Sequence, residues 1–294
     1  MTQFIQTLIL GVLIGGVYAL LASGLTLIFG VMRVINIAHG SFLILAAFVT
    51  YSLWKATGID PLVSIVFTTP MMFAFGWFLY LAAVKRIRGS HMSSSVLLTF
   101  SIALVIEGLM GMIWGNTSHS VRPAYFNQSF SIGDLFLPKA QVYGFLVAVV
   151  VLAALYVVLT RTWLGRAIRA SAVNPEGAAL VGVNVAGVAA LTFGVGVAAA
   201  GAGGSIVSVL YPFLPGSHYQ WIARVLSIVV LGGLGSLPGA AIGALLLGVA
   251  EAMTVTYISP SWAGAVPYVV ILVVLLVRPQ GLLGTRLRED VAPA

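Results

Sequence analysis

Uninterrupted apolar runs of about twenty residues recur along this whole sequence. About 20 apolar residues is the length of α-helix that crosses the hydrocarbon core of a bilayer. Only 7% of the residues are charged and 60% are hydrophobic, whereas roughly a quarter are charged in a soluble domain. Because the runs are continuous rather than alternating, they exclude a β-barrel. The chain is therefore predicted to be an all-α polytopic membrane protein with one domain over residues 1–294.

The apolar pattern predicts eight or nine transmembrane helices. The expected spans are residues 4–29, 41–54, 61–84, 93–114, 141–160, 184–210, two within 222–253, and 263–277. The sixth span is expected to be interrupted by Gly201, Gly203 and Gly204. The turn GGLGSLPG, residues 232–239, is expected to separate the two spans that follow, because Gly and Pro together disfavour a continuous helix.

Basic residues are divided unequally between the two sets of connecting segments. The predicted inner segments hold ten of them, Arg33, Lys85, Arg86, Arg88, Arg161, Arg166, Arg169, Arg278, Arg286 and Arg288, and the outer ones hold three, Lys55, Arg122 and Lys139. Arg224, near a boundary, is left unassigned. Since cytoplasmic loops are enriched in Lys and Arg, the N-terminus is expected outside and the C-terminus inside. The longest polar stretch, residues 115–140, is then an external loop. No nucleic-acid partner is needed to explain the net charge of +7.

A charged, helix-favouring segment, residues 161–183, lies between the fifth and sixth spans. Asn174 followed by Pro175, with Glu176 in the first turn, is a helix-start signal. Two short helices, residues 164–172 and 175–181, are therefore expected to meet at residues 173–174. The second helix is expected to display small residues that let another surface approach closely, Ala178, Ala179 and Gly182. The segment is interpreted either as a docking surface or as an ordinary basic cytoplasmic loop.

Polar residues inside a membrane are costly, so each suggests a function. Asn36 and His39 lie at the junction between the first two spans. They either meet a carboxylate or line a pathway, or they belong to a satisfied loop and cap the next helix beside Ser41. Glu107 and Glu251 are either proton sites, if burial raises their pKa values, or structural hydrogen bonds between helices, and the second interpretation is favoured.

Other sequence features concern packing and exclude some chemistry. Gly11 and Gly15, in the first span, form a small-xxx-small face suited to close helix packing. The Gly-rich turn lacks the strand before it and the Lys-Ser/Thr after it that a phosphate-binding loop needs. The sequence contains no cysteine, which excludes disulfides, thiolate metal sites and a cysteine nucleophile. No serine lies in a nucleophile-elbow pattern, so the chain is not expected to be an enzyme.

Four stretches in this order, YALLASGLTLIFGVMRVINIAHGSF, GRAIRASAVNPEGAALVGVNV, LGGLGSLPGAAIGALLLG and VRPQGLLG, resemble the permease subunits of bacterial ABC importers for branched-chain amino acids. The resemblance covers nearly the whole chain. It implies a subunit of the bacterial cytoplasmic (inner) membrane that pairs with a second related permease. It also implies two cytoplasmic ATPase subunits and an extracytoplasmic substrate-binding protein. ATP would bind the ATPase partners, and no cofactor is expected in this chain.

The resemblance assigns residues 161–183 as the coupling loop to the ATPases. Glu176, Ala178 and Gly182 fit the E-x-A-x-x-x-G core of the importer coupling motif, although Gly177 replaces its first Ala and the hydrophobic-Pro ending is missing. The expected coupling residues are Gly165, Arg166, Arg169, Asn174, Glu176, Ala178 and Gly182. The candidate residues of the substrate pathway are Asn36, His39, Gly40, Ser41, Gly233 and Gly235.

The resemblance suggests leucine, isoleucine and valine as substrates. Similar permeases handle other amino acids, urea or amides, and aromatic carboxylates, and this sequence does not choose among them. A second class of function is a stand-alone secondary transporter or channel, in which Glu107, Glu251 or His39 would carry ions or protons. Such a carrier has no evident use for a docking loop with two helices.

Overall fold

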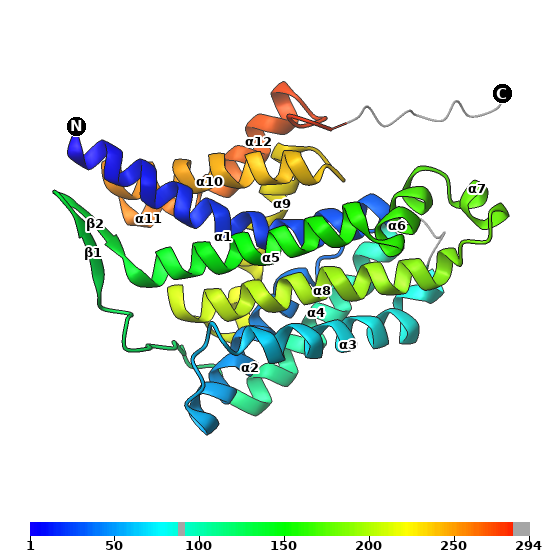
Figure 1. Ribbon diagram of the computed structural model, residues 1–294, viewed down its shortest axis with the longest axis horizontal. Coiled ribbons are helices and arrows are strands. Elements are labelled where there is room, and N and C mark those ends of the chain that lie inside the picture. The colour runs from blue at the N-terminus through cyan, green and yellow to red at the C-terminus, as the bar shows by residue number, and fades with distance from the viewer. Residues whose placement is uncertain (88–91, 285–294) are drawn as a thin grey trace.

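The computed structural model describes residues 1–87 and 92–284, and it is a bundle of helices (Figure 1). The predicted inner residues Arg88, Arg286 and Arg288 lie outside the described residues. The helices are α1 (Thr2–Met32), α2 (His39–Thr57), α3 (Ile65–Ala82), α4 (Met92–Trp114), α5 (Lys139–Arg161), α6 (Trp163–Val173), α7 (Pro175–Leu180), α8 (Val185–Leu210), α9 (His218–Gly232), α10 (Leu237–Tyr257), α11 (Pro260–Ala263) and α12 (Val266–Val277). Two short 3-10 helices are η1 (Val84–Ile87) and η2 (Pro215–Ser217).

Seven helices of the described residues are long and apolar enough to cross a membrane: α1, α2, α3, α4, α5, α8 and α10. This confirms the prediction of an all-α polytopic membrane protein. The other two predicted spans are shorter helices, since α9 has 15 residues and α12 has 12. At 1.5 Å per residue, 15 residues reach only about 22 Å, less than the ~30 Å of a hydrocarbon core.

The helices α1 and α10 lie in close backbone contact along a row of glycines. A Cβ on Gly248 would lie 2.5 Å from the Gly11 carbonyl oxygen and 2.6 Å from the Gly15 amide nitrogen. A Cβ on Gly15 would in turn lie 2.8 Å from the Leu245 Cα. Distances this short leave no room for a side chain. The small-xxx-small face predicted from Gly11 and Gly15 is therefore confirmed, and its partner is Gly248.

The helix α8 runs without a break from Val185 to Leu210, so the predicted interruption at Gly201, Gly203 and Gly204 is wrong. These glycines lie where α8 packs against its neighbours: a Cβ on Gly201 would lie 2.8 Å from the Met72 Cβ, and Gly203 and Gly204 face Leu21 of α1 and the Leu43 carbonyl of α2. In an apolar interior the backbone has no hydrogen-bond partner outside the helix, which keeps the helix intact despite its glycines.

Residues 115–140 contain a β-hairpin that the sequence reading missed. Strands β1 (Ser129–Ile132) and β2 (Leu135–Pro138) pair antiparallel around Gly133, whose φ is 59°. His119 forms an isolated bridge with Phe213, which ties this segment to the connector between α8 and α9. The N-terminus and the hairpin lie at one end of the bundle, and α6 and α7 lie at the other (Figure 1).

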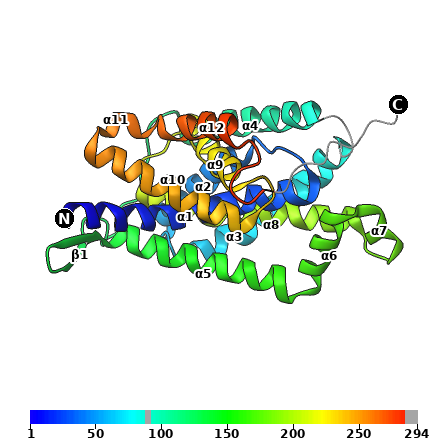
Figure 2. The ribbon, with the colours of Figure 1, turned by 90° about the horizontal axis from the view of Figure 1, so that it is seen from above.

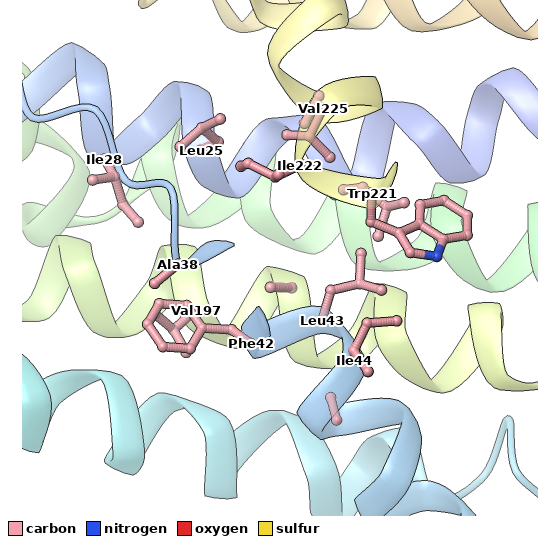
Figure 3. Close-up of a cluster of buried hydrophobic side chains, with 14 of the residues drawn as sticks. Leu25, Ile28, Ala38, Phe42, Leu43, Ile44, Val197, Trp221, Ile222 and Val225 are labelled. Carbon is pink, nitrogen blue, oxygen red and sulfur yellow. The ribbon is translucent and has the colours of Figure 1, made fainter. Parts of the chain in front are cut away.

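The GGLGSLPG turn separates α9 from α10, as predicted, but α9 is not a regular span. It runs across the direction of α1 rather than along it (Figure 1). Its residues Trp221, Ile222 and Val225 enter the main hydrophobic cluster together with Leu25 of α1 and Phe42 of α2 (Figure 3). Of the two helices in this apolar region, α9 lies across the direction of the bundle, and only α10 is long enough to span the membrane.

Candidate functional site

The segment 161–183 forms two capped helices, as predicted. The Thr162 side chain accepts a hydrogen bond from the Gly165 amide at 3.2 Å and begins α6. The Asn174 side chain accepts one from the Gly177 amide at 2.9 Å and begins α7. Both are N-caps, which satisfy amide groups that a helix leaves unpaired at its first turn. The expected meeting point at residues 173–174 is confirmed.

The helix α6 is attached to the bundle by its inner face. Ala167 and Ile168 are buried in a cluster with Leu27 of α1 and Leu159 of α5. Arg169 donates a hydrogen bond to the Leu159 carbonyl, and Gly165 is packed against the same peptide group. Of the residues expected to bind the ATPases, Gly165 and Arg169 therefore hold α6 in place.

The outer face of the pair α6–α7 is exposed at the tip of the molecule. Arg166, Asn174, Glu176 and Gly182 are exposed, and Gly182 has a φ of 85°. Ala178, by contrast, is only 4% exposed, so the expectation that α7 displays it is wrong: Ala178 lies on the side of α7 that packs toward the bundle. Ala179 is exposed, as expected.

The sequence reading missed the apolar residues at this tip. Leu180 is 89% exposed, Val181 is 78% and Val173 is 85%. Exposed apolar patches rimmed by polar residues mark protein interaction sites. We call Val173, Leu180 and Val181, with the neighbouring Glu176, the tip surface. The apolar residues Leu180 and Val181 at the end of a polar segment were the signal in the sequence for this surface.

The chain between α1 and α2 passes through the buried interior. The Thr99 hydroxyl of α4 contacts this connector and accepts a hydrogen bond from the Ile37 amide at 3.2 Å. Its one proton has the Ser95 carbonyl of α4 at 2.8 Å and the Ile35 carbonyl of the connector at 3.2 Å as acceptors. Asn36, His39 and Ser41 are each 0% exposed. His39 donates from Nε2 to the Leu21 carbonyl of α1 at 3.0 Å.

Several polar atoms at this junction have no hydrogen-bond partner within the described residues. They are both amide atoms of Asn36, Nδ1 of His39 and the hydroxyl of Ser41. The first turn of α2 begins at Ala38 without a side-chain cap, so the alternative in which Asn36 and His39 cap this helix is wrong. Buried polar atoms without partners are rare and require an explanation.

The first turns of α2 and α9 meet at this junction. A Cβ on Gly40 would lie 2.5 Å from the His218 carbonyl oxygen and 3.0 Å from the Ile222 Cβ. Nε2 of His218 lies 3.0 Å from Oε2 of Glu107, and the Tyr219 hydroxyl donates to the same oxygen at 3.1 Å. Glu107 thus makes the hydrogen bonds between helices that the sequence analysis favoured.

Glu251 forms the second buried polar cluster, with residues that the sequence reading did not connect to it. Arg224 of α9 donates from Nε to Oε1 of Glu251 at 2.9 Å. The Tyr18 hydroxyl of α1 donates to the other carboxylate oxygen at 2.5 Å. Glu251 is 7% exposed, so it is buried and paired. An Arg inside an apolar run was the signal for this pair, although no local pattern identifies its partner.

Gly233 and Gly235 shape the turn between α9 and α10. Their φ angles are 101° and 81°, a region that side chains rarely adopt. Gly235 packs near Gly30 of α1, since a Cβ on it would lie 3.3 Å from the Gly30 Cα. Among the candidate pathway residues, Gly235 lines a cavity of about 590 Å³, and Asn36, His39, Gly40 and Ser41 do not line it.

This cavity lies along the half of α1 nearest the tip surface. Its apolar walls come from α1, α5 and α10, and Ser23 and Thr26 of α1 are among its few polar residues. Ile168, Arg169 and Ala172 of α6 also line it. One helix of the exposed pair therefore forms part of the wall of a partly open cavity.

The sequence comparisons agree with each other. The sequence model of the family described as branched-chain amino acid transport system, permease component, matches residues 7–275. The chain is 30% identical over 295 residues to the high-affinity branched-chain amino acid transport system permease protein LivH of Escherichia coli K12, covering 96% of each chain. It is 30% identical over 300 residues to the corresponding protein BraD of Pseudomonas aeruginosa, again covering 96% of each. It is 27% identical over 288 residues to a probable LivH of Methanocaldococcus jannaschii, covering 90% of this chain and 88% of that protein. No solved structure matches the chain.

Proposed function

Because the chain belongs to the family of permease components of branched-chain amino acid transport systems, we propose that it is the membrane subunit through which an ATP-driven importer moves leucine, isoleucine and valine into the cell. The observation that carries the coupling to ATP is the tip surface. Leu180 and Val181 project from a capped helix pair at one end of the bundle. Exposed apolar residues in such a place need a protein partner.

The proposed partners are two ATPase subunits at the tip surface, a second related permease beside the bundle and a substrate-binding protein at the opposite end. The hairpin and the N-terminus then lie outside a bacterial cytoplasmic membrane, and α6 and α7 lie inside. The excess of Lys and Arg in the inner segments supports this orientation. ATP binds the ATPase subunits.

The contacts of α6 support a mechanism for coupling. Arg169 and Ile168 line the cavity beside α1, and the tip surface follows α6 directly along the chain. When the ATPases close on ATP, they displace the tip surface, and α6 transmits the displacement to the cavity wall. Such a lever requires that the contacts of α6 differ between the two states.

The test is purification of the tagged chain from its native membrane, followed by reconstitution in liposomes. We expect two ATPase subunits and a second permease to copurify, and leucine uptake to require both ATP and the binding protein. Competition by isoleucine, valine, urea and an aromatic carboxylate then identifies the substrate class. A chain that purifies alone and moves solute without ATP would refute the proposal and favour a secondary transporter that uses Glu107 or Glu251.

Asn36 provides a test of the pathway. Its amide atoms are buried without a partner in the described structure, so replacing it with leucine removes no hydrogen bond of the fold. We expect Asn36→Leu to unfold at the wild-type temperature or above it, because an unpaired buried amide is itself destabilising. We expect its ATP-driven uptake to fall at least about tenfold, the cost of one hydrogen bond to a charged solute.

The matched control is Thr99→Val, a change of similar character on the facing helix. It removes the hydroxyl that accepts a hydrogen bond from the Ile37 amide of the connector and is expected to lower the free energy of unfolding by about 1–3 kcal/mol. Thermal unfolding in detergent and uptake are measured for both variants. Full uptake by Asn36→Leu removes this residue from the pathway, and a loss of stability equal to that of Thr99→Val assigns it a structural role.

A further inference from the structure

Arg224 occupies an exceptional position for a charge. Among the described helices assigned to the membrane, it is the only Lys or Arg that lies more than one turn from a helix end. A charged side chain at such a place is costly and is retained for a purpose. The structure supplies part of the compensation, through Glu251 and Tyr18.

Glu251 uses only one edge of the Arg224 guanidinium. The hydrogen bond to Glu251 comes from Nε, and the Trp221 ring lies with its centroid 5.1 Å from the guanidinium carbon. Within residues 1–87 and 92–284, the two terminal nitrogens of Arg224 donate no hydrogen bond. The carboxylate of Glu251 therefore neutralises and orients the guanidinium while its terminal nitrogens stay available.

We refer to the partly exposed polar residues of α4 and α9, Glu107, Tyr219, Gln220 and Arg224, together as the polar surface. The helix α9 packs against α1, α2, α10 and α12, and the short helix η2 before it packs against α4. The helices α4 and α12 lie on the side opposite α5 (Figure 2). The Arg224 side chain is 16% exposed, Glu107 is 28% and Tyr219 is 45%. Gln220, one helical turn before Arg224, is also exposed.

Lipid tails cannot serve as hydrogen-bond partners for this polar surface. Ionisable residues within a membrane face protein or a water-filled route rather than lipid. The surface of Glu107, Tyr219, Gln220 and Arg224 must therefore be covered by the second permease or by the solute that passes between the two subunits.

We infer that this polar surface lines the route of the solute, and that the terminal nitrogens of Arg224 bind the carboxylate of the transported amino acid. The inference rests on the proposed function and adds a binding residue to it. A guanidinium and a carboxylate form two parallel hydrogen bonds, which fix orientation as well as charge. The apolar side chain of the solute is then free to contact the apolar helices around α9.

The test is equilibrium binding of labelled leucine to the assembled importer in nanodiscs of zwitterionic lipid, without the binding protein. Zwitterionic lipid removes anionic headgroups that would compete for a cation. We expect saturable binding that leucinamide, which lacks the carboxylate, does not displace. Arg224→Gln is expected to weaken binding at least about tenfold, the loss of a charge-assisted hydrogen bond. The affinity of Arg224→Lys for leucine is expected to lie between that of the wild type and that of Arg224→Gln, since lysine keeps the charge but cannot form two parallel hydrogen bonds.

The matched variant is Glu251→Gln, which breaks the same ion pair from the other side. If the pair were only structural, both variants would lose binding and stability alike, because each leaves the other charge buried and unpaired. If Arg224 binds the solute, we expect the affinity of Glu251→Gln for leucine to be within about threefold of the wild-type affinity or higher, because Arg224 keeps its charge and donors.

Two outcomes overturn the inference: equal losses in Arg224→Gln and Glu251→Gln, or displacement of leucine by leucinamide in the native importer. ATP-driven uptake by the native importer is measured in parallel. Uptake that persists unchanged in Arg224→Gln refutes the role of Arg224 alone, whereas absence of uptake in the native importer refutes the proposed function.

Discussion

Leu180→Glu is expected to release the ATPase subunits from the permease and to abolish ATP-driven uptake. Leu180 is 89% exposed, so replacing it is expected to change the stability of the permease itself very little. We expect Leu180 to act as a hot-spot residue of this interface, for which truncation costs about 2 kcal/mol or more, or roughly thirtyfold weaker binding. The carboxylate adds a further cost, because it is buried without a partner when the ATPase docks.

The measurement is the amount of ATPase retained per permease after purification, together with leucine uptake in liposomes. The matched control is Ile132→Glu, the same kind of change at a residue that is 64% exposed on the hairpin at the opposite end of the molecule. We expect this control to keep its ATPase subunits. A Leu180→Glu permease that retains the full complement of ATPase would place the docking surface elsewhere.

Gly15→Leu is expected to destabilise the bundle by forcing α1 and α10 apart. Its Cβ would meet the Leu245 Cα at 2.8 Å and the Ala244 carbonyl oxygen at 3.0 Å. These are backbone atoms, which do not move away as a side chain does, so α1 and α10 must separate. Overpacking a tight core costs about 1–3 kcal/mol. Because the displaced atoms belong to a whole helix, we expect the upper end, or roughly 6–12 °C in the unfolding temperature.

The control for this change is Gly108→Leu in α4. Gly108 is also a helical glycine, but a Cβ there meets nothing within 4 Å, and leucine favours the helix by about 0.8–1 kcal/mol over glycine. Thermal unfolding of both variants in the same detergent separates packing from helix propensity. If Gly15→Leu unfolded at the same temperature as Gly108→Leu, the close contact between α1 and α10 would be wrong.

The features that the sequence predicted correctly have local causes. Asn174 and Pro175 begin a helix by their own chemistry, and the structure shows the cap where it was expected. Gly11 and Gly15 are spaced to lie on one face of a helix, which predicted close packing before the partner was known. The apolar runs located the seven long helices for the same reason.

The features that the sequence did not predict depend on partners distant in the chain. The glycines of α8 indicated a break, but in the structure they accommodate Leu21 and Leu43. Ala178 was predicted to be exposed on α7, but it is buried because that side of α7 packs toward the bundle. The pair of Arg224 and Glu251 joins residues on two helices separated by a turn, and no spacing rule links them. The hairpin at Gly133 could have been predicted from the sequence, since Gly followed by Asp between short apolar runs predicts a two-residue turn.

The short crossing helix α9 has a consequence for how the chain enters the membrane. With 15 residues, it is too short to span, and it carries Arg224, a residue that opposes insertion by about 2.5–3.5 kcal/mol at a helix centre. The translocation machinery would therefore not release α9 into lipid as an independent segment. In the folded bundle, α9 is enclosed by α1, α2, α10 and α12, which pack around it. We therefore expect α9 to be incorporated late in assembly, after α10 and α12 have been synthesised.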